Sequence, residues 1–283
     1  MDPLIITAAC GYTRPPGKED HQETVASIVD AVVEAARAGA AIVQIRAPHS
    51  IDPQTGRPVT DLKTWIELIG TIRQRCDVLI HAGVAAMPID QRIELFKAAR
   101  PDIASFLLGH HSIVVRGREL SSLRTRADAL RLLQAHVETR VVPDFEIFHA
   151  GSTRNLAFLL DQVDVPRPLV TTLFFGWDGG EWSPPTVEEY LHRLSLVPSD
   201  ALYSSTVAGA EQSLLHALAI GRGGHVRAGL GDYPYFNEGV LAASTAQWIP
   251  RFKQMAQDLS RELATPQQAA AIIGVAQRAS ATV

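Results

Sequence analysis

Residues 39–81, GAAIVQIRAPHSIDPQTGRPVTDLKTWIELIGTIRQRCDVLIH, contain the repeating unit that decides the fold. A short β-branched run, AIVQIR at 41–46, precedes an amphipathic stretch at 62–75, and a second short run, VLIH, follows at 78–81. Short strands that alternate with longer helices are typical of parallel sheets, because a parallel connection needs a crossover of a dozen or more residues. This stretch therefore predicts a strand–helix–strand unit.

The same alternation extends outward to both ends of the chain. Eight short runs are expected to be strands: 4–9, 41–46, 78–81, 103–108, 140–148, 169–174, 202–207 and 225–229. Helical periodicity predicts helices at 23–38, 62–75, 89–99, within 122–136, at 155–163, 187–196, 211–220 and 238–263, and from Pro266, which Thr265 caps. Eight strand–helix units predict a (β/α)8 TIM barrel.

We expect a single (β/α)8 barrel domain over residues 1–283 with a C-terminal helical extension, since no linker or low-complexity tract interrupts the pattern. The length of 283 residues suits a fold that needs about 250. An open doubly wound sheet is the alternative. The lack of a G-x-G-x-x-G turn after the first run weighs against it.

Composition narrows the class of partner. A net charge of −4 gives no reason to expect nucleic acid or an anionic membrane. Two cysteines make no disulfide framework, which fits a reducing compartment. No basic residue precedes the first apolar run, and no apolar run reaches the roughly 18 residues of a membrane helix. We expect a cytoplasmic protein with no membrane or nucleic-acid partner.

In a TIM barrel the active site lies at the C-terminal ends of the strands. The polar and aromatic side chains expected there are Tyr12, Gln44, Arg46, His49, His81, His110, His111, Asp144, Glu146, His149, Trp177, Arg227 and Asp232. Five histidines at one rim favour acid–base or metal chemistry, because histidine titrates near neutral pH. His225 begins the last strand, so we expect a structural role for it.

Two kinds of covalent chemistry are disfavoured. A Schiff-base or pyridoxal enzyme needs a lysine at a strand end. The four lysines, Lys18, Lys63, Lys97 and Lys253, lie on predicted helices or before the first one. Cys10 ends an apolar run, where a cysteine is more often a packing residue than a nucleophile.

Several segments together resemble the β-keto acid cleavage enzymes, the family that includes 3-keto-5-aminohexanoate cleavage enzyme. They are PLIITAA at 3–9, EAARAGAAIVQIR at 34–46, VVPDFEIF at 141–148, GGHVRAGLGDYPYFNEGV at 223–240 and ATPQQAAAIIG at 264–274. The resemblance implies a TIM barrel in a homo-oligomer. It also implies that a β-keto acid and acetyl-CoA are converted to acetoacetate and a new CoA ester, with a divalent metal, usually zinc, holding the keto acid.

The resemblance also assigns residues, and here the chain departs from the family. Family members bind the metal through an H-x-H at the end of the second strand and a Glu after the last one; these positions are Gln44, Arg46 and Gly231. Neither Arg46 nor Gly231 can supply a side-chain ligand, and a glutamine carbonyl is a weak one for zinc. Arg227 and Asp232 match the family's arginine and base. His81 stands in a turn that is usually Ser-Thr-Gly-Gly, and Tyr12 or a neighbour replaces an acidic residue.

Three interpretations follow from these departures. In the first, the enzyme keeps carbon–carbon bond or enolate chemistry, such as retro-Claisen cleavage, decarboxylation or isomerisation, and Arg46 supplies the positive charge in place of the metal. In the second, zinc binds at a relocated site made by rim histidines, although adjacent His110 and His111 can seldom both face one ion. In the third, the barrel binds a small molecule without catalysis.

We adopt the first interpretation, with acetyl-CoA as the candidate co-substrate and a small carboxylate or keto acid as the substrate. The expected catalytic residues are Asp232, Arg227, Arg46 and His110. The expected substrate-binding residues are Gln44, His49, His81, His111, Asp144, Glu146, Tyr12 and Trp177. No residue is assigned to a metal, and no other cofactor is expected.

Overall fold

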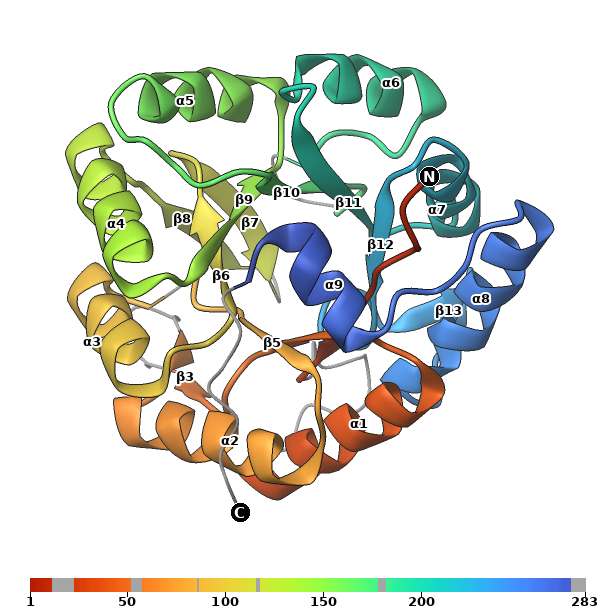
Figure 1. Cartoon of the computed structure of the whole chain (residues 1–283), viewed down its shortest axis with the longest axis horizontal. Coiled ribbons are helices and arrows are strands. Elements are labelled where there is room, and N and C mark those ends of the chain that lie inside the picture. The colour runs from red at the N-terminus through yellow and green to blue at the C-terminus, as the bar shows by residue number, and fades with distance from the viewer. Residues whose placement is uncertain (12–22, 52–57, 86, 116–117, 178–181, 276–283) are drawn as a thin grey trace.

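The computed structural model describes residues 1–11, 23–51, 58–85, 87–115, 118–177 and 182–275. Eight parallel strands form a closed barrel in the order β1-β12-β11-β10-β9-β6-β5-β2, and helices surround it (Figure 1). The barrel strands are β1 (Ile6–Cys10), β2 (Ile42–Ile45), β5 (Leu79–Ala82), β6 (Ile103–Leu107), β9 (Val142–Ile147), β10 (Leu169–Phe175), β11 (Ala201–Val207) and β12 (His225–Ala228). The predicted TIM barrel is confirmed.

Capping residues in the local sequence explain where several of the outer helices begin and end. They are α1 (Val25–Ala38), α2 (Leu62–Arg75), α3 (Ile89–Ala99), α4 (Arg126–Thr139), α5 (Ala150–Leu160), α6 (Val187–Leu196) and α7 (Gln212–Gly221), with α8 (Trp248–Asp258) and α9 (Pro266–Ile273) after the last barrel strand. Thr24 and Ser27 form a capping box on α1, and Gly39 ends that helix in a left-handed conformation. Thr265 caps α9, with Pro266 in its first turn, as predicted. None of the helices in the described part of the chain could cross a membrane.

The segment 238–263 differs from its prediction as one long helix. β13 (Tyr235–Asn237) pairs with β14 (Val240–Leu241) in a hairpin, and only η1 (Thr245–Gln247) and α8 are helical. Gly239 lies at the hairpin turn with a φ of 68°. Glycine adopts this left-handed conformation without steric cost, so the chain reverses where a helix was expected.

Two loops at the C-terminal ends of the strands contain hairpins that the sequence did not predict. β3 (Ser50–Ile51) pairs with β4 (Pro58–Val59), and β7 (His111–Val115) pairs with β8 (Arg118–Ser122). Two helices depart from their predicted bounds: α4 begins inside the predicted range but extends past it to Thr139, and α5 begins five residues earlier than predicted, directly after His149.

The last helix, α9, closes the N-terminal end of the barrel and lies over its centre in Figure 1. Its buried residues, Ala269 and Ile273, pack in one cluster with Ile5, which directly precedes β1, and with Ile42 and Ile103, which begin β2 and β6. Because α9 covers the N-terminal end of the barrel, the open side is the opposite end, where the strands terminate.

The part of the barrel interior nearest the C-terminal ends of the strands is polar. Along β9, Phe145 and Ile147 belong to the core between barrel and helices, whereas the alternating residues Asp144 and Glu146 are buried polar groups. This period of two follows from strand geometry, in which successive side chains point to opposite faces. The β9 carboxylates therefore lie inside the barrel, where the candidate site must be sought.

Closure of the barrel by α9 predicts a measurable stability effect. Ile273 is 3% exposed, so we expect Ile273→Ala to lower the free energy of unfolding by about 2–4 kcal/mol through lost burial and a cavity. Leu214→Ala on α7 is the matched control, since Leu214 is 57% exposed and its truncation should change stability by less than about 0.5 kcal/mol. Urea unfolding measures both variants. Equal effects would mean that α9 does not close the core.

Candidate active site

The best-defined contact at the open end of the barrel joins Arg227, on β12, to Asp232, in the following loop. Arg227 Nε donates to Asp232 Oδ2 at 2.7 Å, and Arg227 Nη2 donates to Asp232 Oδ1 at 2.8 Å. The two side chains are 2% and 3% exposed. A bidentate pair of this kind fixes both groups and suits a buried charge, which needs a partner.

Arg46, directly after β2, is a second arginine on the same carboxylate. Its Nη2 donates to Asp232 Oδ1 at 3.1 Å, and its Nη1 donates to the carbonyl oxygen of Gly231. The Arg46 side chain is 36% exposed, so part of its guanidinium faces solvent. These contacts use two of the five N–H donors that a guanidinium carries, which leaves donors for an anionic ligand.

Gly231 accommodates this arginine because it has no side chain. A Cβ atom at position 231 would lie 2.9 Å from Arg46 Nη1 and 2.7 Å from the carbonyl oxygen of Gly11. The second contact is with backbone, so it cannot be relieved by a change of rotamer. Position 231 is therefore restricted to glycine by the surrounding backbone, and the Arg46 guanidinium lies beside the space that this leaves.

Below the arginines lies a second polar layer. His81 Nε2, on β5, is 3.3 Å from Ser105 Oγ and 3.6 Å from Asp144 Oδ2. Thr172 Oγ1 lies within 2.9 Å of both Asp144 carboxylate oxygens, and Arg227 Nη1 is 3.8 Å from Asp144 Oδ2. The lower layer is thereby linked to the Arg227–Asp232 pair.

Burial and neighbouring charge push the titratable groups in different directions. Burial, followed by the charge of Glu146, raises the pKa of Asp144 to about 7, although Arg227 and the hydrogen bond from Thr172 oppose the rise. Burial also raises the pKa of Glu146, although Arg227 and a hydrogen bond from Ser105 offset part of the rise. Burial, followed by the Arg227 charge, lowers the pKa of His81 well below its usual value, so this imidazole is neutral.

Asp232 behaves in the opposite way. Burial alone would raise its pKa, but the charge of Arg227 and its hydrogen bonds, and then those of Arg46, hold the pKa below its usual value. Asp232 is therefore ionised at neutral pH. For Arg227, burial would lower the pKa, and the Asp232 carboxylate more than offsets this.

The structure brings together six of the residues expected from the sequence: Asp232, Arg227, Arg46, His81, Asp144 and Glu146. Gln44 pairs in register with His81 on the adjacent strand and is buried, with its amide nitrogen close above Gly83. Tyr12 lies outside the described residues.

The remaining predicted residues lie apart from this cluster. His110, expected to be catalytic, is exposed just before β7, and His49 is exposed with Nδ1 3.3 Å from the Ala47 carbonyl oxygen. His111 accepts a hydrogen bond from Trp182 Nε1 at 3.0 Å and stacks on Phe148, while Trp177 donates to the Val114 carbonyl oxygen. The sequence places each of these residues just after a strand. That position alone does not show whether a side chain faces the barrel interior or the surrounding loops.

The relocated metal site has no geometric counterpart among the residues that the structure describes. Within them, no group of three His, Cys, Asp or Glu side chains is arranged to hold an ion. Cys10 is fully buried, and burial raises the pKa of its thiol, which agrees with the packing role expected for it.

Sequence reasoning missed two hydroxyl groups in the interior, Ser105 on β6 and Thr172 on β10. Both are buried, and both contact titratable side chains of the site. The sequence contains a weak indication of both positions, since each is a small polar residue in a mainly apolar run. The alternation of a strand would have placed each on the inner face.

Comparison with known proteins shows that one protein family matches nearly the whole chain. The sequence model of the family described as beta-keto acid cleavage enzyme matches residues 3–275. A 3,5-dioxohexanoate:acetyl-CoA acetone transferase of Paraburkholderia graminis is 26% identical, over 94% of this chain and 93% of its own length. A 3-keto-5-aminohexanoate cleavage enzyme of Fusobacterium nucleatum is also 26% identical, over 97% of this chain and 99% of its own.

The solved structures agree on the fold. ObcA, in a ternary complex with a C4-CoA adduct and oxalate, superposes with a TM-score of 0.65 at 15% identity. The match covers 89% of this chain and 66% of the ObcA chain, so this chain spans about two thirds of that protein. At this identity the likeness concerns the barrel alone.

The raised pKa of Asp144 predicts how stability depends on pH. The unfolded carboxyl loses its proton near the usual pKa of 3.8, whereas the folded one has a pKa of about 7. Asp144 therefore costs stability as pH rises through this window, by at most about 1.4 kcal/mol per pH unit. Asp144→Asn should remove this cost, so its free energy of unfolding relative to wild type should rise between pH 4 and 7.

Urea unfolding at several pH values tests this expectation. Thr171→Val, a buried change on the neighbouring strand, is the control and should leave the pH dependence as in wild type. A constant difference between Asp144→Asn and wild type from pH 4 to 7 would show that the carboxyl is already ionised at acid pH.

Proposed function

Because the chain belongs to the β-keto acid cleavage enzyme family, we propose that it is an enzyme in which Arg46 takes the place of the family's metal ion. Its substrate is a small β-keto acid or a related carboxylate, and its chemistry is carbon–carbon bond cleavage of the retro-Claisen type or a related enolate reaction. The observation that carries the proposal is the Arg46 guanidinium, which bridges Gly231 and Asp232 at the mouth of the barrel.

The residues at the family's metal positions do not fit a metal ion. Arg46 is a cation and would repel one, and Gly231 has no side-chain ligand. A Cβ at position 231 would meet backbone, so this loop has no room for a glutamate in its present form. We therefore derive no step through a metal.

An arginine can perform much of the electrostatic work that a metal performs on a keto acid. Its planar fork holds a carboxylate or an enolate oxygen through two hydrogen bonds, and its charge persists at every relevant pH. In the proposed reaction Asp232 removes a proton from the carbon between the ketone and the carboxylate, and Arg46 stabilises the negative charge that develops on oxygen. Stabilisation of that charge by fixed donors is usually the largest catalytic contribution.

Arg227 orients the base in this scheme. Its bidentate contact fixes both Asp232 oxygens, so the carboxylate cannot turn away from the substrate. The same contact keeps Asp232 ionised, which it must be to accept a proton. It also weakens Asp232 as a base, so efficient turnover requires that the proton be passed on.

Acetyl-CoA is the proposed co-substrate, since the name of the Paraburkholderia relative includes it and the family resemblance implies it. Acetoacetate and a new CoA ester are then the products. The cytoplasmic location and the homo-oligomer expected from the sequence stay predictions.

The activity is tested by incubating the protein with acetyl-CoA and one of three keto acids: 3-oxohexanoate, 3-oxoadipate and 5-amino-3-oxohexanoate. We expect acetoacetate from at least one of them, measured by mass spectrometry. Arg46→Lys should lower kcat/KM about 100-fold, because an ammonium group cannot form two parallel hydrogen bonds. Asp232→Asn should abolish turnover.

Arg75→Lys is the control for these variants, since Arg75 is an exposed residue of α2. Release of carbon dioxide without a CoA ester would indicate decarboxylation instead of cleavage. If Arg46→Lys is as active as wild type, arginine does not replace the metal.

The metal content of the purified protein is a separate prediction. We expect well below one zinc per chain by elemental analysis, and we expect incubation with EDTA to leave activity unchanged, because the substrate would be held by Arg46. About one zinc per chain that survives dialysis would contradict the proposal.

A further inference from the structure

A continuous series of buried polar side chains crosses the barrel interior beneath the arginines. We call it the buried polar chain, and its members, in order of contact, are Glu146, Ser105, His81 and Asp144. The Ser105 hydroxyl hydrogen-bonds to the Glu146 carboxylate, and Ser105 Oγ is 3.3 Å from His81 Nε2. The same nitrogen is 3.6 Å from Asp144 Oδ2. Three adjacent strands, β5, β6 and β9, supply these groups.

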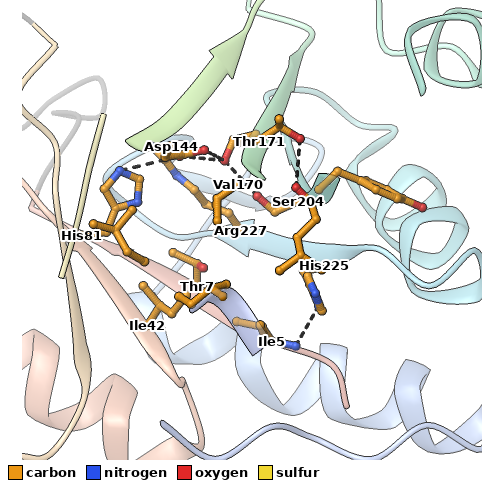
Figure 2. A pocket seen from close by; sticks show the side chains of 15 residues that line it. Ile5, Thr7, Ile42, His81, Asp144, Val170, Thr171, Ser204, His225 and Arg227 are labelled. Atoms are coloured by element: carbon orange, nitrogen blue, oxygen red, sulfur yellow. Dashed lines mark hydrogen bonds and ion pairs between the residues drawn. The ribbon is translucent and has the colours of Figure 1, made fainter. Parts of the chain in front are cut away.

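The two ends of the buried polar chain differ. At the upper end, one Glu146 oxygen, Oε2, is buried and has no hydrogen-bond partner, although Glu146 is only 4% exposed. At the lower end, Asp144 and His81 line a small cavity inside the barrel and point toward each other from two strands (Figure 2). A buried carboxylate oxygen without a partner is costly unless it is protonated or is met by a ligand.

Charges from every side act on these carboxylates. Arg227, from β12, lies 3.8 Å from Asp144, and Thr172, from β10, contacts both Asp144 oxygens. Arg227, Arg92 of α3 and Arg46 all act on Glu146. The like charges are those of Asp232 on Asp144 and of the two β9 carboxylates on each other. The charge of one carboxylate therefore opposes ionisation of the other.

We propose that the buried polar chain is a proton relay that connects the active site to a proton store at Asp144. The bonds balance as follows. The O–H bond of protonated Asp144 breaks as an N–H bond forms at His81 Nε2. That proton then passes to Ser105 Oγ while the hydroxyl proton of Ser105 bonds to Glu146. Asp144 ends as a carboxylate, Glu146 as a carboxylic acid, and His81 and Ser105 are restored.

The neutral state of His81 makes this sequence workable. Because burial and Arg227 lower the pKa of the imidazole, the charged form exists only during transfer, and the proton resides on a carboxyl group. Glu146 completes the link, since a carboxyl group can accept a proton at one oxygen and release one at the other. Its Oε2 atom is the one left for substrate or for Asp232's proton.

This inference rests on the proposed function and deepens it, because the same sequence of bond changes, run in reverse from Glu146 to Asp144, carries away from the active site the proton that Asp232 has removed from the substrate. Its central feature can nevertheless be tested without substrate. When Asp144 is protonated, it donates to His81 Nε2, so the imidazole carries its hydrogen on Nδ1. When Asp144 is ionised, Nε2 donates instead. The neutral imidazole must therefore exchange one tautomer for the other as Asp144 titrates.

The experiment records the ¹⁵N shifts of histidine-labelled full-length protein from pH 5 to 9, with the His81 signals assigned by their loss in His81→Gln. We expect the tautomer exchange with a midpoint near pH 7. Asp144→Asn should lock the Nδ1–H form. Glu146→Gln should move the midpoint down by about one pH unit, since a like charge is removed. Thr171→Val is the control and should behave as wild type.

A single His81 tautomer over the whole range, or a midpoint that Glu146→Gln leaves unchanged, overturns the relay. With an active keto acid, Ser105→Ala should lower kcat about 100-fold at constant KM, and Ser105→Thr should restore it. If the tautomers exchange but no keto acid reacts, the relay stands and the proposed function falls. If turnover occurs without tautomer exchange, the relay falls and the proposed function stands.

Discussion

The open end of this barrel depends on one carboxylate, Asp232, which two arginines share. Arg227 reaches it from within the barrel, with both contacts under 3 Å, and Arg46 reaches it from the mouth. A guanidinium as deeply buried as that of Arg227 is tolerated only when an anion and well-formed hydrogen bonds compensate its lost hydration. Asp232 provides them, so structure and chemistry depend on the same ion pair.

The second constraint is the size of residue 231. The carbonyl oxygens of Gly11 and Ala9 leave no room for a Cβ at position 231, and the Arg46 guanidinium packs against the bare Gly231 backbone. In the proposed function, a position that would hold an anionic metal ligand is Gly231, and one that would hold a neutral ligand is the cation Arg46. Both changes alter the local charge in the same direction as a bound metal would, which is why the proposed exchange of metal for arginine is chemically economical.

The barrel interior beneath the open end contains more acidic than basic side chains. Asp144 and Glu146 lie on one face of β9, two residues apart, while Arg227 already serves Asp232. Burial raises the pKa of both carboxyl groups above their usual values, and for Asp144 this crowding adds to the rise. His81 and Ser105 then have a purpose beyond packing, because they join the two carboxyl groups across three strands.

Several features of the protein were readable from the chain. Strand–helix alternation predicted the barrel, since periodicity reflects burial along a single element. Arg227 and Asp232 are five residues apart, so their meeting at the end of one strand was also predictable. The error over 238–263 came from Gly239, whose turn separates two segments of similar composition. His110 was expected at the site and lies exposed on a loop, because a position just after a strand does not determine whether a side chain faces inward or outward.

The sequence by itself determined the barrel, the inward alternation of Asp144 and Glu146 along β9, and the presence of an arginine at 46 and a glycine at 231. Only the tertiary structure decided that Arg46 fills the space beside Gly231, 185 residues away, and that Asp144, His81, Ser105 and Glu146 form one connected series. The physical reason is that closure of a barrel sets neighbours by strand order and register. Those distances are fixed across the sheet, and no local pattern along the chain encodes them.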